Sequence, residues 1–496
     1  MCMHEPLPST PLTLLPDTDT SPSNEQDAAS GLPSGILRER ACELMVAVLG
    51  TKTDEEKRRF LTDGLALCSA SGLTCVQTND ERCVAAYQEL LADGALDLRI
   101  FLTPMHNELA EMAVHQPRPP NALQARWEEG RNGHAETQVQ GDGEGEGGRV
   151  CMSARKSMLV VNRVKIFCDG SLGAETAALR SVAAADGTSE TGGTGGWEKK
   201  EEGMLIHADD ALVVKVAAAH AAGLRLEMHA IGDRAADQVL RALSAAHVPA
   251  HARPIMTHCQ ILGADLVARM AAQGVVANVQ PAFVPTDMKW VSERIAAPQQ
   301  AFAYAWRTLM AAGVVVAGGS DAPVEPCSPL LGMHDAILRR ARPPLSPPPA
   351  DVPADVPADV YRPSECLSFA QALWIYTVGG ALASGSEAVL GKIHVGYAGD
   401  VVFLDPAVMR DPALLKDALP RAVVVGGRLV RGRAWVDGRD TDLVVPVAPT
   451  PDTEPTNERT ERPTPGLFVP GRNGARPNRF RCACVLEGKG YLCAGL

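Results

Sequence analysis

The sequence has few aromatic residues, no surplus of positive charge and no long hydrophobic run. Phe, Trp and Tyr make up 4% of the 496 residues, and 59 acidic side chains against 47 basic ones give a formal net charge of −12. An acidic chain without a basic stripe is not expected to bind nucleic acid or an anionic membrane surface. No apolar run approaches the roughly 18 to 20 residues that span a bilayer, and no basic stretch precedes an apolar one at the start. We therefore expect a cytoplasmic protein that acts on a small molecule.

The cysteines do not form the pattern of a disulfide framework. There are 13 of them, an odd number, and most lie singly inside apolar segments, as Cys75, Cys168, Cys259 and Cys366 do. Such cysteines are typical of reduced, buried thiols. The length of 496 residues is enough for one large or two ordinary domains, and a hydrophobic share of 46% is typical of a globular core.

Short apolar strands alternate with amphipathic helices over most of the chain, which favours an α/β fold with a parallel sheet or barrel. Helices are predicted, for example, at 208–223 and 261–274. Strands are predicted within seven segments, one short of a closed eight-stranded barrel: 73–78, 96–103, 157–170, 223–230, 252–260, 274–280 and 313–323.

Composition divides the chain into four parts. Residues 1–34 and 446–496 are rich in Pro, Thr and charged residues without hydrophobic period, and are predicted to be disordered. A helical pattern begins near residue 34, and residues 35–385 form the α/β part. In residues 386–445 apolar and polar side chains alternate between Gly-containing turns, a pattern that predicts a small β module. Two low-complexity insertions interrupt the α/β part, at about 116–157 and 341–363.

Four predicted strands end on side chains that can bind a metal or transfer a proton. These are Lys165, His229, His258 and Asp321, each on a different strand and far from the next along the chain. No local ligand motif exists at such spacing, so the four meet only if their strands form one barrel, whose carboxyl ends carry the functional groups. Taken singly, each histidine is more often a hydrogen-bonded core residue, and Lys165 more often a salt-bridged lysine.

Polar residues just beyond these strands are candidates for substrate contact. Asp169, Gly170 and Ser171 follow the strand of Lys165, and Asp287 and Trp290 follow the segment at 274–280. Turn formation or packing explains each of them equally well. Asp233 is expected to cap the helix that begins at the sequence "RAADQVL".

Four segments, taken in order, resemble the amidohydrolase superfamily and within it the amidohydrolase-3 (YtcJ-like) family. They are "VKIFCDGSLGAETAAL", "MHAIGDRAADQVL", "PIMTHCQ" and "VVVAGGSDAPVEPCSPLLGMHDAI". The resemblance extends from about residue 33 to 435, apart from the two insertions. It implies a TIM-like (β/α)8 barrel of the metal-dependent hydrolase type, with a small composite β-sandwich to which 386–445 contributes.

The resemblance also implies a reaction and roles for the four strand-end residues. It implies hydrolysis of an amide-type, non-peptide C–N bond of a small molecule by metal-activated water. Lys165 would be carboxylated and bridge two divalent metals, His229 and His258 would bind the second metal, and Asp321 would contact the first and shuttle the proton. Zinc is the expected metal, because two imidazoles and a third ligand suit a catalytic zinc.

One part of the family pattern has no counterpart in this sequence. The first barrel strand of the superfamily ends in His-x-His, and none of the 12 histidines here is paired in that way. We therefore expect an incomplete barrel without its first strand, and one metal ion rather than two. Unpaired strand edges favour association with a second copy of the chain. The alternative is a truncated or diverged, non-catalytic relative with an incomplete metal site.

Overall fold

The computed structural model describes four stretches of the chain with their side chains: residues 50–108 without residue 51, 158–181, 203–342 and 360–432. Seven short strand segments are described by their backbone alone, namely 24–26, 33–37, 182–183, 189–190, 434–436, 439–441 and 493–494. Most of the predicted disordered ends and insertions lie outside the described residues.

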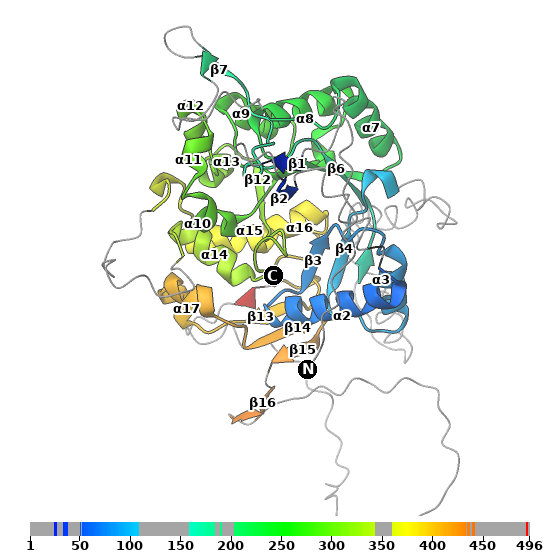
Figure 1. Ribbon diagram of the computed structural model, residues 1–496. Coiled ribbons are helices and arrows are strands. Elements are labelled where there is room, and N and C mark those ends of the chain that lie inside the picture. The colour runs from blue at the N-terminus through cyan, green and yellow to red at the C-terminus, as the bar shows by residue number, and fades with distance from the viewer. Residues whose placement is uncertain are drawn as a thin grey trace, which may run out of the picture.

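Parallel strands form the wall of a barrel-like sheet (Figure 1). One ladder has the order β3 (Cys75–Thr78), β4 (Arg99–Leu102), β5 (Leu159–Val160). The other has five strands in the order β6 (Arg163–Phe167), β9 (Arg225–Ala230), β10 (Ile255–His258), β11 (Val276–Val279), β12 (Val315–Gly318). A parallel bridge between Met105 and Lys165 joins the two ladders. Since β5 and β6 belong to one predicted segment, all seven predicted strands of the α/β part are found.

Helices cover the outside of this sheet (Figure 1). The first of them, α2, begins with a capping box in which Thr53 and Glu56 satisfy each other's backbone N–H groups. The longer helices are α2 (Asp54–Ala70), α3 (Val84–Ala92), α7 (Asp209–Ala221), α8 (Asp233–Ala245), α9 (Ala264–Ala272), α13 (Trp306–Ala311), α14 (Pro329–Leu338), α15 (Phe369–Tyr376) and α16 (Val378–Ser384). Among the helices that the structure describes, none combines the length and apolarity needed to cross a bilayer.

Short helical turns fill the connections between these elements. The α-helical ones are α10 (Val284–Asp287), α11 (Val291–Arg294), α12 (Ala297–Gln300) and α17 (Ala407–Arg410). The 3-10 turns are η2 (His106–Glu108), η3 (Ala250–Ala252), η4 (Pro281–Phe283), η5 (Pro363–Glu365) and η6 (Pro412–Asp417).

The outer face of the sheet forms the main hydrophobic core. Alternate residues of the strands, such as Val164, Ile166 and Met228, point toward the helices and are almost fully buried. Helix α8 contributes Val239 and Leu240 to the same cluster. Burial of such side chains stabilises the fold by about 1.5 to 3 kcal/mol each, so this core fixes the strands that carry the candidate site.

The inner face of the sheet is closed at the amino ends of the strands by α16. Ile255, Val276 and Ala317 form a small apolar cluster with Ala383 of this helix. The helix approaches β12 so closely that a Cβ atom on Gly379 would lie 2.2 Å from the carbonyl oxygen of Val316. Helix α16 therefore packs against β10, β11 and β12.

The carboxy-terminal part forms a separate antiparallel sheet. It contains β13 (Val401–Phe403), β14 (Ala422–Val425), β15 (Arg428–Gly432) and β18 (Cys493–Ala494), and a further pair is formed by β16 (Ala434–Val436) and β17 (Arg439–Thr441). A buried, bidentate ion pair between Arg99 of β4 and Asp400 ties this sheet to the barrel, at 2.7 and 3.0 Å.

Three local features differ from the sequence-based expectations. Strand β2 (Pro33–Leu37), which pairs with β1 (Asn24–Gln26), stands where a helical pattern and, before it, disorder are expected. A short pair, β7 (Val182–Ala183) with β8 (Ser189–Glu190), follows the barrel strand β6. The cap of α8 is Gly232 rather than Asp233, because Asp233 already lies inside the helix and accepts hydrogen bonds from Arg180 and Gln299.

Candidate metal centre

Two histidine rings meet at the carboxyl ends of neighbouring barrel strands. His229 is in β9 and His258 ends β10, and their ring centroids lie 4.6 Å apart at 72°. Phe167, the last residue of β6, packs on His229 with a centroid distance of 5.0 Å. The parallel register of β6, β9 and β10 therefore brings together two imidazoles that a whole helix, α8, separates in the sequence.

His258 reaches the interior through a local backbone distortion. Its φ angle is +82° and that of Cys259 is +49°. Residues other than Gly rarely adopt positive φ angles. Alternation along β10 would otherwise turn His258 toward the helices, since Thr257 faces inward. Strain of this kind is concentrated at functional sites.

The nitrogen atoms of the two rings have defined roles. Nδ1 of His258 lies 2.8 Å from the amide oxygen of Gln280, an acceptor, so Nδ1 carries the proton and Nε2 the lone pair. Nε2 of His229 lies 3.0 Å from the carbonyl oxygen of Gly170 and 3.2 Å from a carboxylate oxygen of Asp169. That nitrogen therefore carries a proton, and Nδ1 of His229 is left buried without a hydrogen-bond partner.

The ring of His258 is held in its neutral form. Burial, followed by the charges of His229 and Lys165, lowers the pKa of His258 well below its ordinary value. A neutral imidazole is the form that binds a metal ion. The buried, unpartnered Nδ1 of His229 and the lone pair of His258 thus supply two nitrogen ligands of the type that zinc prefers.

Lys165 lies deeper in the barrel and forms an ion pair, the alternative that the sequence left open, with a partner that the sequence analysis did not identify. Its Nζ atom donates to a carboxylate oxygen of Glu227 at 2.9 Å and to the hydroxyl of Thr257 at 3.3 Å. Arg163 contacts the other oxygen of Glu227 at 3.1 Å. Burial alone would raise the pKa of Glu227, but the charges of Lys165 and Arg163 outweigh it and lower the pKa to about 2. Glu227 is therefore an anion between two cations.

Asp321 stands on the wall of the cavity above these residues. It follows β12 with a φ angle of +56°, and its side chain is exposed to the cavity. Partial desolvation raises the pKa of its carboxyl group, against the opposing attraction of Lys165 and His229. A carboxyl group with a raised pKa is suited to accept and return a proton near neutral pH.

The cavity has a volume of about 640 Å³ and opens between β3 and β12. Within the described residues, each of these two strands is hydrogen-bonded to a neighbour on one side only. Besides Lys165, Glu227 and Asp321, its wall carries polar side chains from several strands and loops, among them Gln77, Asp80, Asn278 and Gln280. The cavity is thus large enough for a small organic molecule and rich in hydrogen-bonding groups.

The five residues predicted to bind substrate lie outside the lining of this cavity. The carboxylate of Asp169 is buried and accepts from the backbone N–H groups of Ala178, Ile231 and Gly232. The carbonyl of Gly170 faces His229, and the hydroxyl of Ser171 accepts from Ala174. These contacts make the loop after β6 a rigid support for His229, and substrate contact by its residues stays a prediction.

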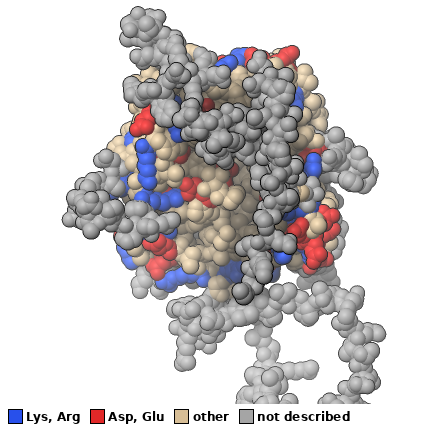
Figure 2. Space-filling model, viewed as in Figure 1, with Lys and Arg blue, Asp and Glu red and all other residues tan. Residues whose placement is uncertain are grey.

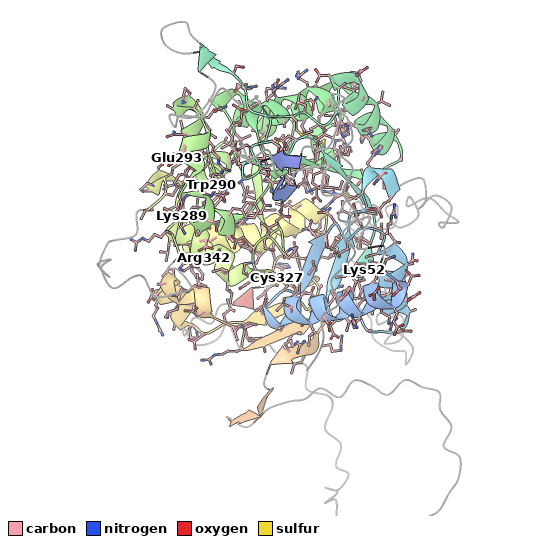
Figure 3. The ribbon with its side chains drawn as sticks, in the orientation of Figure 1. Lys52, Lys289, Trp290, Glu293, Cys327 and Arg342 are labelled. Carbon is pink, nitrogen blue, oxygen red and sulfur yellow. The ribbon has the colours of Figure 1, made fainter. Side chains whose placement is uncertain are left out.

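Asp287 and Trp290 also make internal contacts. Asp287 accepts hydrogen bonds from Tyr304 at 2.6 Å and Gln260 at 3.1 Å, and burial raises its pKa to about 6. The guanidinium of Arg294 stacks over the ring of Trp290 at 4.3 Å. Figure 3 shows Trp290 on the side of the molecule formed by α10 and α11. Neither side chain lines the cavity, so the role of Asp287 and Trp290 in substrate binding stays a prediction.

Three ligands of the types His, Cys, Asp or Glu do not come together anywhere in the described part of the chain. The two histidines, however, fit a divalent cation, because Nδ1 of His229 is buried without a hydrogen-bond partner and the neutral ring of His258 keeps the lone pair of its Nε2. Neither ring belongs to the lining of the cavity. Lys165 as an ammonium group does not fit as a ligand, since a cation repels a cation.

Solved structures of metal-dependent hydrolases share this fold. An uncharacterized metal-dependent hydrolase from Pyrococcus horikoshii matches 76% of this chain with a TM-score of 0.55 and 22% sequence identity. A second one from Pyrococcus furiosus matches 76% of it with a TM-score of 0.53 and 23% identity. In both cases the match covers 65% of the other chain.

The family model Amidohydro_3, described as the amidohydrolase family, matches residues 13–431, so the chain belongs to the amidohydrolase family. It is 29% identical over 412 residues to YtcJ of Bacillus subtilis, which is named as an amidohydrolase, with coverage of 81% of this chain and 66% of YtcJ. It is 28% identical over 285 residues to LONG AFTER FAR-RED 3 of Arabidopsis thaliana, with coverage of 56% and 44%. The chain thus spans less than two thirds of the length of these relatives.

Proposed function

We propose that the chain is a metal-dependent hydrolase that cleaves an amide-type C–N bond of a small molecule. The observation that carries this proposal is the pair of imidazoles, His229 and His258, each with a nitrogen lone pair free for a cation at the carboxyl ends of adjacent strands. Membership of the amidohydrolase family supports the reaction class. We further propose zinc as the metal and one ion per chain, because two described imidazoles suit a single zinc site.

The metal would be held by Nδ1 of His229 and Nε2 of His258. When bound, a divalent cation would lower the pKa of water from about 15.7 toward about 7. Asp321, on the cavity wall with its raised pKa, takes the proton from water and delivers it to the leaving nitrogen. Asn278, on the cavity wall, can hold a polar group of a substrate. The hydrogen bond from Nδ1 of His258 to Gln280 keeps the imidazole in the tautomer whose Nε2 carries the lone pair.

Carboxylation of Lys165 belongs to the same proposal and requires a rearrangement. The Lys165 ammonium now neutralises Glu227, whereas a carbamate would place a second negative charge beside that carboxylate. Such a change is favourable only when a divalent cation supplies the compensating charge. We therefore propose that carboxylation and metal binding occur together, with Arg163 as the remaining partner of Glu227.

The Lys165–Glu227 ion pair also supports a second candidate, a non-catalytic protein that keeps the barrel. In that case the pair is the permanent state and the cavity binds a small molecule without turnover. In both cases we propose a cytoplasmic protein whose partner is a small molecule rather than nucleic acid or membrane, and which can associate with a second copy. Figure 2 shows both acidic and basic side chains on the face in view.

Hydrolysis assays separate the two candidates. The zinc-loaded chain is incubated with a panel of N-formyl and N-acyl amines, and release of the amine is measured. We expect turnover by the wild type and a loss of about 100-fold or more in kcat for Asp321→Asn, the size expected for removal of a proton-transfer group. Asp97→Asn, at an exposed ion pair with Arg428, is the matched control and keeps full activity. Absence of turnover in the wild type, or equal turnover in Asp321→Asn, contradicts the catalytic proposal.

A further inference from the structure

Two cysteine thiols from distant parts of the sequence meet at the cavity. Cys68 lies in the last turn of α2, and Cys327 lies in the loop between β12 and α14. Both line the cavity and both are half-buried. The hydroxyl of Ser71 is a third member of the group, at 3.5 Å from the sulfur of Cys327. Figure 3 shows Cys327 in the region between α14 and α2.

The two thiols differ in reactivity. The hydrogen bond from Cys68 lowers the pKa of Cys327 to about 6, although burial opposes this, and the hydroxyl of Ser71 adds to the effect. The pKa of Cys68 is raised, chiefly because its proton is held in the hydrogen bond to Cys327. A thiolate with a thiol beside it is the arrangement of a nucleophilic cysteine and its resolving partner.

Three other described cysteines lack a lowered pKa. Cys75 lines the same cavity, but burial raises its pKa to about 12. Cys168 and Cys259 are buried on strand ends, and burial raises the pKa of both thiols. Among the described cysteines with a shifted pKa, Cys327 is the one whose pKa is lowered.

We propose that Cys68 and Cys327 form a reversible disulfide that joins α2 to the Asp321 loop across the mouth of the cavity. This modification goes beyond the proposed hydrolase function and does not depend on it. Cys327 follows Asp321 in the same loop, and α2 belongs to the side of the barrel formed by β3, whereas the loop belongs to the side formed by β12. The bond would therefore tie together the two strand edges between which the cavity opens.

The reaction requires an oxidant, for which a low-molecular-weight disulfide such as oxidised glutathione is sufficient. The Cys327 thiolate attacks one sulfur of the oxidant and expels one glutathione thiolate, which leaves a mixed disulfide. Cys68 then loses its proton to solvent and attacks the Cys327 sulfur, which releases the second glutathione. Two protein thiols are oxidised, and one oxidised glutathione is reduced to two molecules of glutathione.

Peptide mapping tests the proposal on the full chain. The protein is exposed to oxidised glutathione, its remaining thiols are blocked with N-ethylmaleimide at acidic pH, and it is digested with trypsin. We expect the peptide 60–82, which contains Cys68 and Cys75, to be linked to the peptide 308–339, which contains Cys327 alone. Dithiothreitol should separate the two peptides. Absence of the linked species, or linkage of 308–339 to another peptide, overturns the proposal.

Variants assign the bond to its two sulfurs. Cys75→Ser should still give the linked peptides, whereas Cys68→Ser should not. Persistence of the link in Cys68→Ser would assign the bond to Cys75 and refute the proposal.

Alkylation rates provide a readout that does not require the disulfide. In the wild type the reaction of Cys327 with iodoacetamide should show an inflection near pH 6. Cys68→Ser keeps a hydrogen-bond donor and should retain fast alkylation below pH 7, whereas Cys68→Val should move the inflection toward the ordinary thiol range near 8.5. An inflection near 8.5 in the wild type contradicts the paired geometry.

Discussion

Replacing Glu227 with Gln removes the negative charge from the ion cluster inside the barrel while keeping the size of the side chain. In the native protein the carboxylate lies 2.9 Å from the Lys165 ammonium and 3.1 Å from the Arg163 guanidinium. Both cations are almost fully buried, at 3% and 2% exposure. Gln offers them one hydrogen-bond acceptor but no charge, so the substitution leaves two buried cations without their anion.

The expected loss of stability follows from the pKa of Glu227. It falls from 4.5 to about 2 on folding, and each pKa unit corresponds to about 1.4 kcal/mol, so the carboxylate contributes about 3 kcal/mol at neutral pH. This value agrees with the 3 to 5 kcal/mol that removal of one partner typically costs in a buried ion pair. Because the folded pKa is depressed, the stabilisation is complete above about pH 4.5 and is lost as the pH falls toward about 2.

Urea unfolding at pH 7 and pH 3 measures this contribution directly. We expect Glu227→Gln to lower the free energy of unfolding by about 3 kcal/mol at pH 7 and by roughly half of that at pH 3. Asp97→Asn, which breaks the exposed ion pair with Arg428 at 2.7 Å, should cost less than about 1 kcal/mol. A cost below about 1 kcal/mol for Glu227→Gln at pH 7, or an equal cost at both pH values, would refute the reasoning.

Two further substitutions test the packing and the electrostatics of the fold. In Gly232→Ala the new Cβ atom would lie 1.9 Å from the carbonyl oxygen of Ala178, so we expect a loss of about 1 to 3 kcal/mol, measured by thermal unfolding, whereas Gly173→Ala meets nothing within 4 Å and should be neutral. Asp287 has a folded pKa of about 6, so the wild type should lose stability as the pH rises from about 4 to 6, and Asp287→Asn should abolish that decline in urea titrations. Identical pH profiles, or equal stability of the two glycine variants, would contradict these expectations.

The sequence predicted the strands well because buried parallel strands are short, continuous apolar runs between helices. The run "GVVANVQ", for example, contains β11 (Val276–Val279). The same pattern located the ends of these strands and therefore Lys165, His229, His258 and Asp321. What it predicted less well was the loops, since Asp169 and Asp287 are engaged in internal hydrogen bonds that no local pattern reveals.

Glu227 could have been found from the sequence and was missed. In β9 the alternation of side chains places Glu227 on the same face as His229, and in β6 it places Arg163 with Lys165. Reading every second residue inward would thus have revealed the buried ion cluster. The inward turn of His258 could not have been predicted in this way, because it depends on a positive φ angle that breaks the alternation.

The proximity of Cys68 and Cys327 also could not be predicted from the sequence. One cysteine lies at a helix end before β3 and the other in a loop after β12, so only the curvature of the sheet, which brings these two strands to the same cavity, places the cysteines near each other. The sequence indicates that its cysteines are reduced and mostly isolated, which holds for Cys168 and Cys259 in the described core.

Metal content is the most direct measure of the central claim that His229 and His258 hold a divalent cation. The purified chain is loaded with Zn²⁺, dialysed, and analysed for zinc per mole of protein. We expect about one zinc in the wild type and less than a tenth of that in His229→Ala and His258→Ala, because loss of either imidazole leaves too few ligands for tight binding. His247→Ala, at an exposed histidine, should retain the wild-type content. Zinc content that is equal in the wild type and His258→Ala would contradict the account.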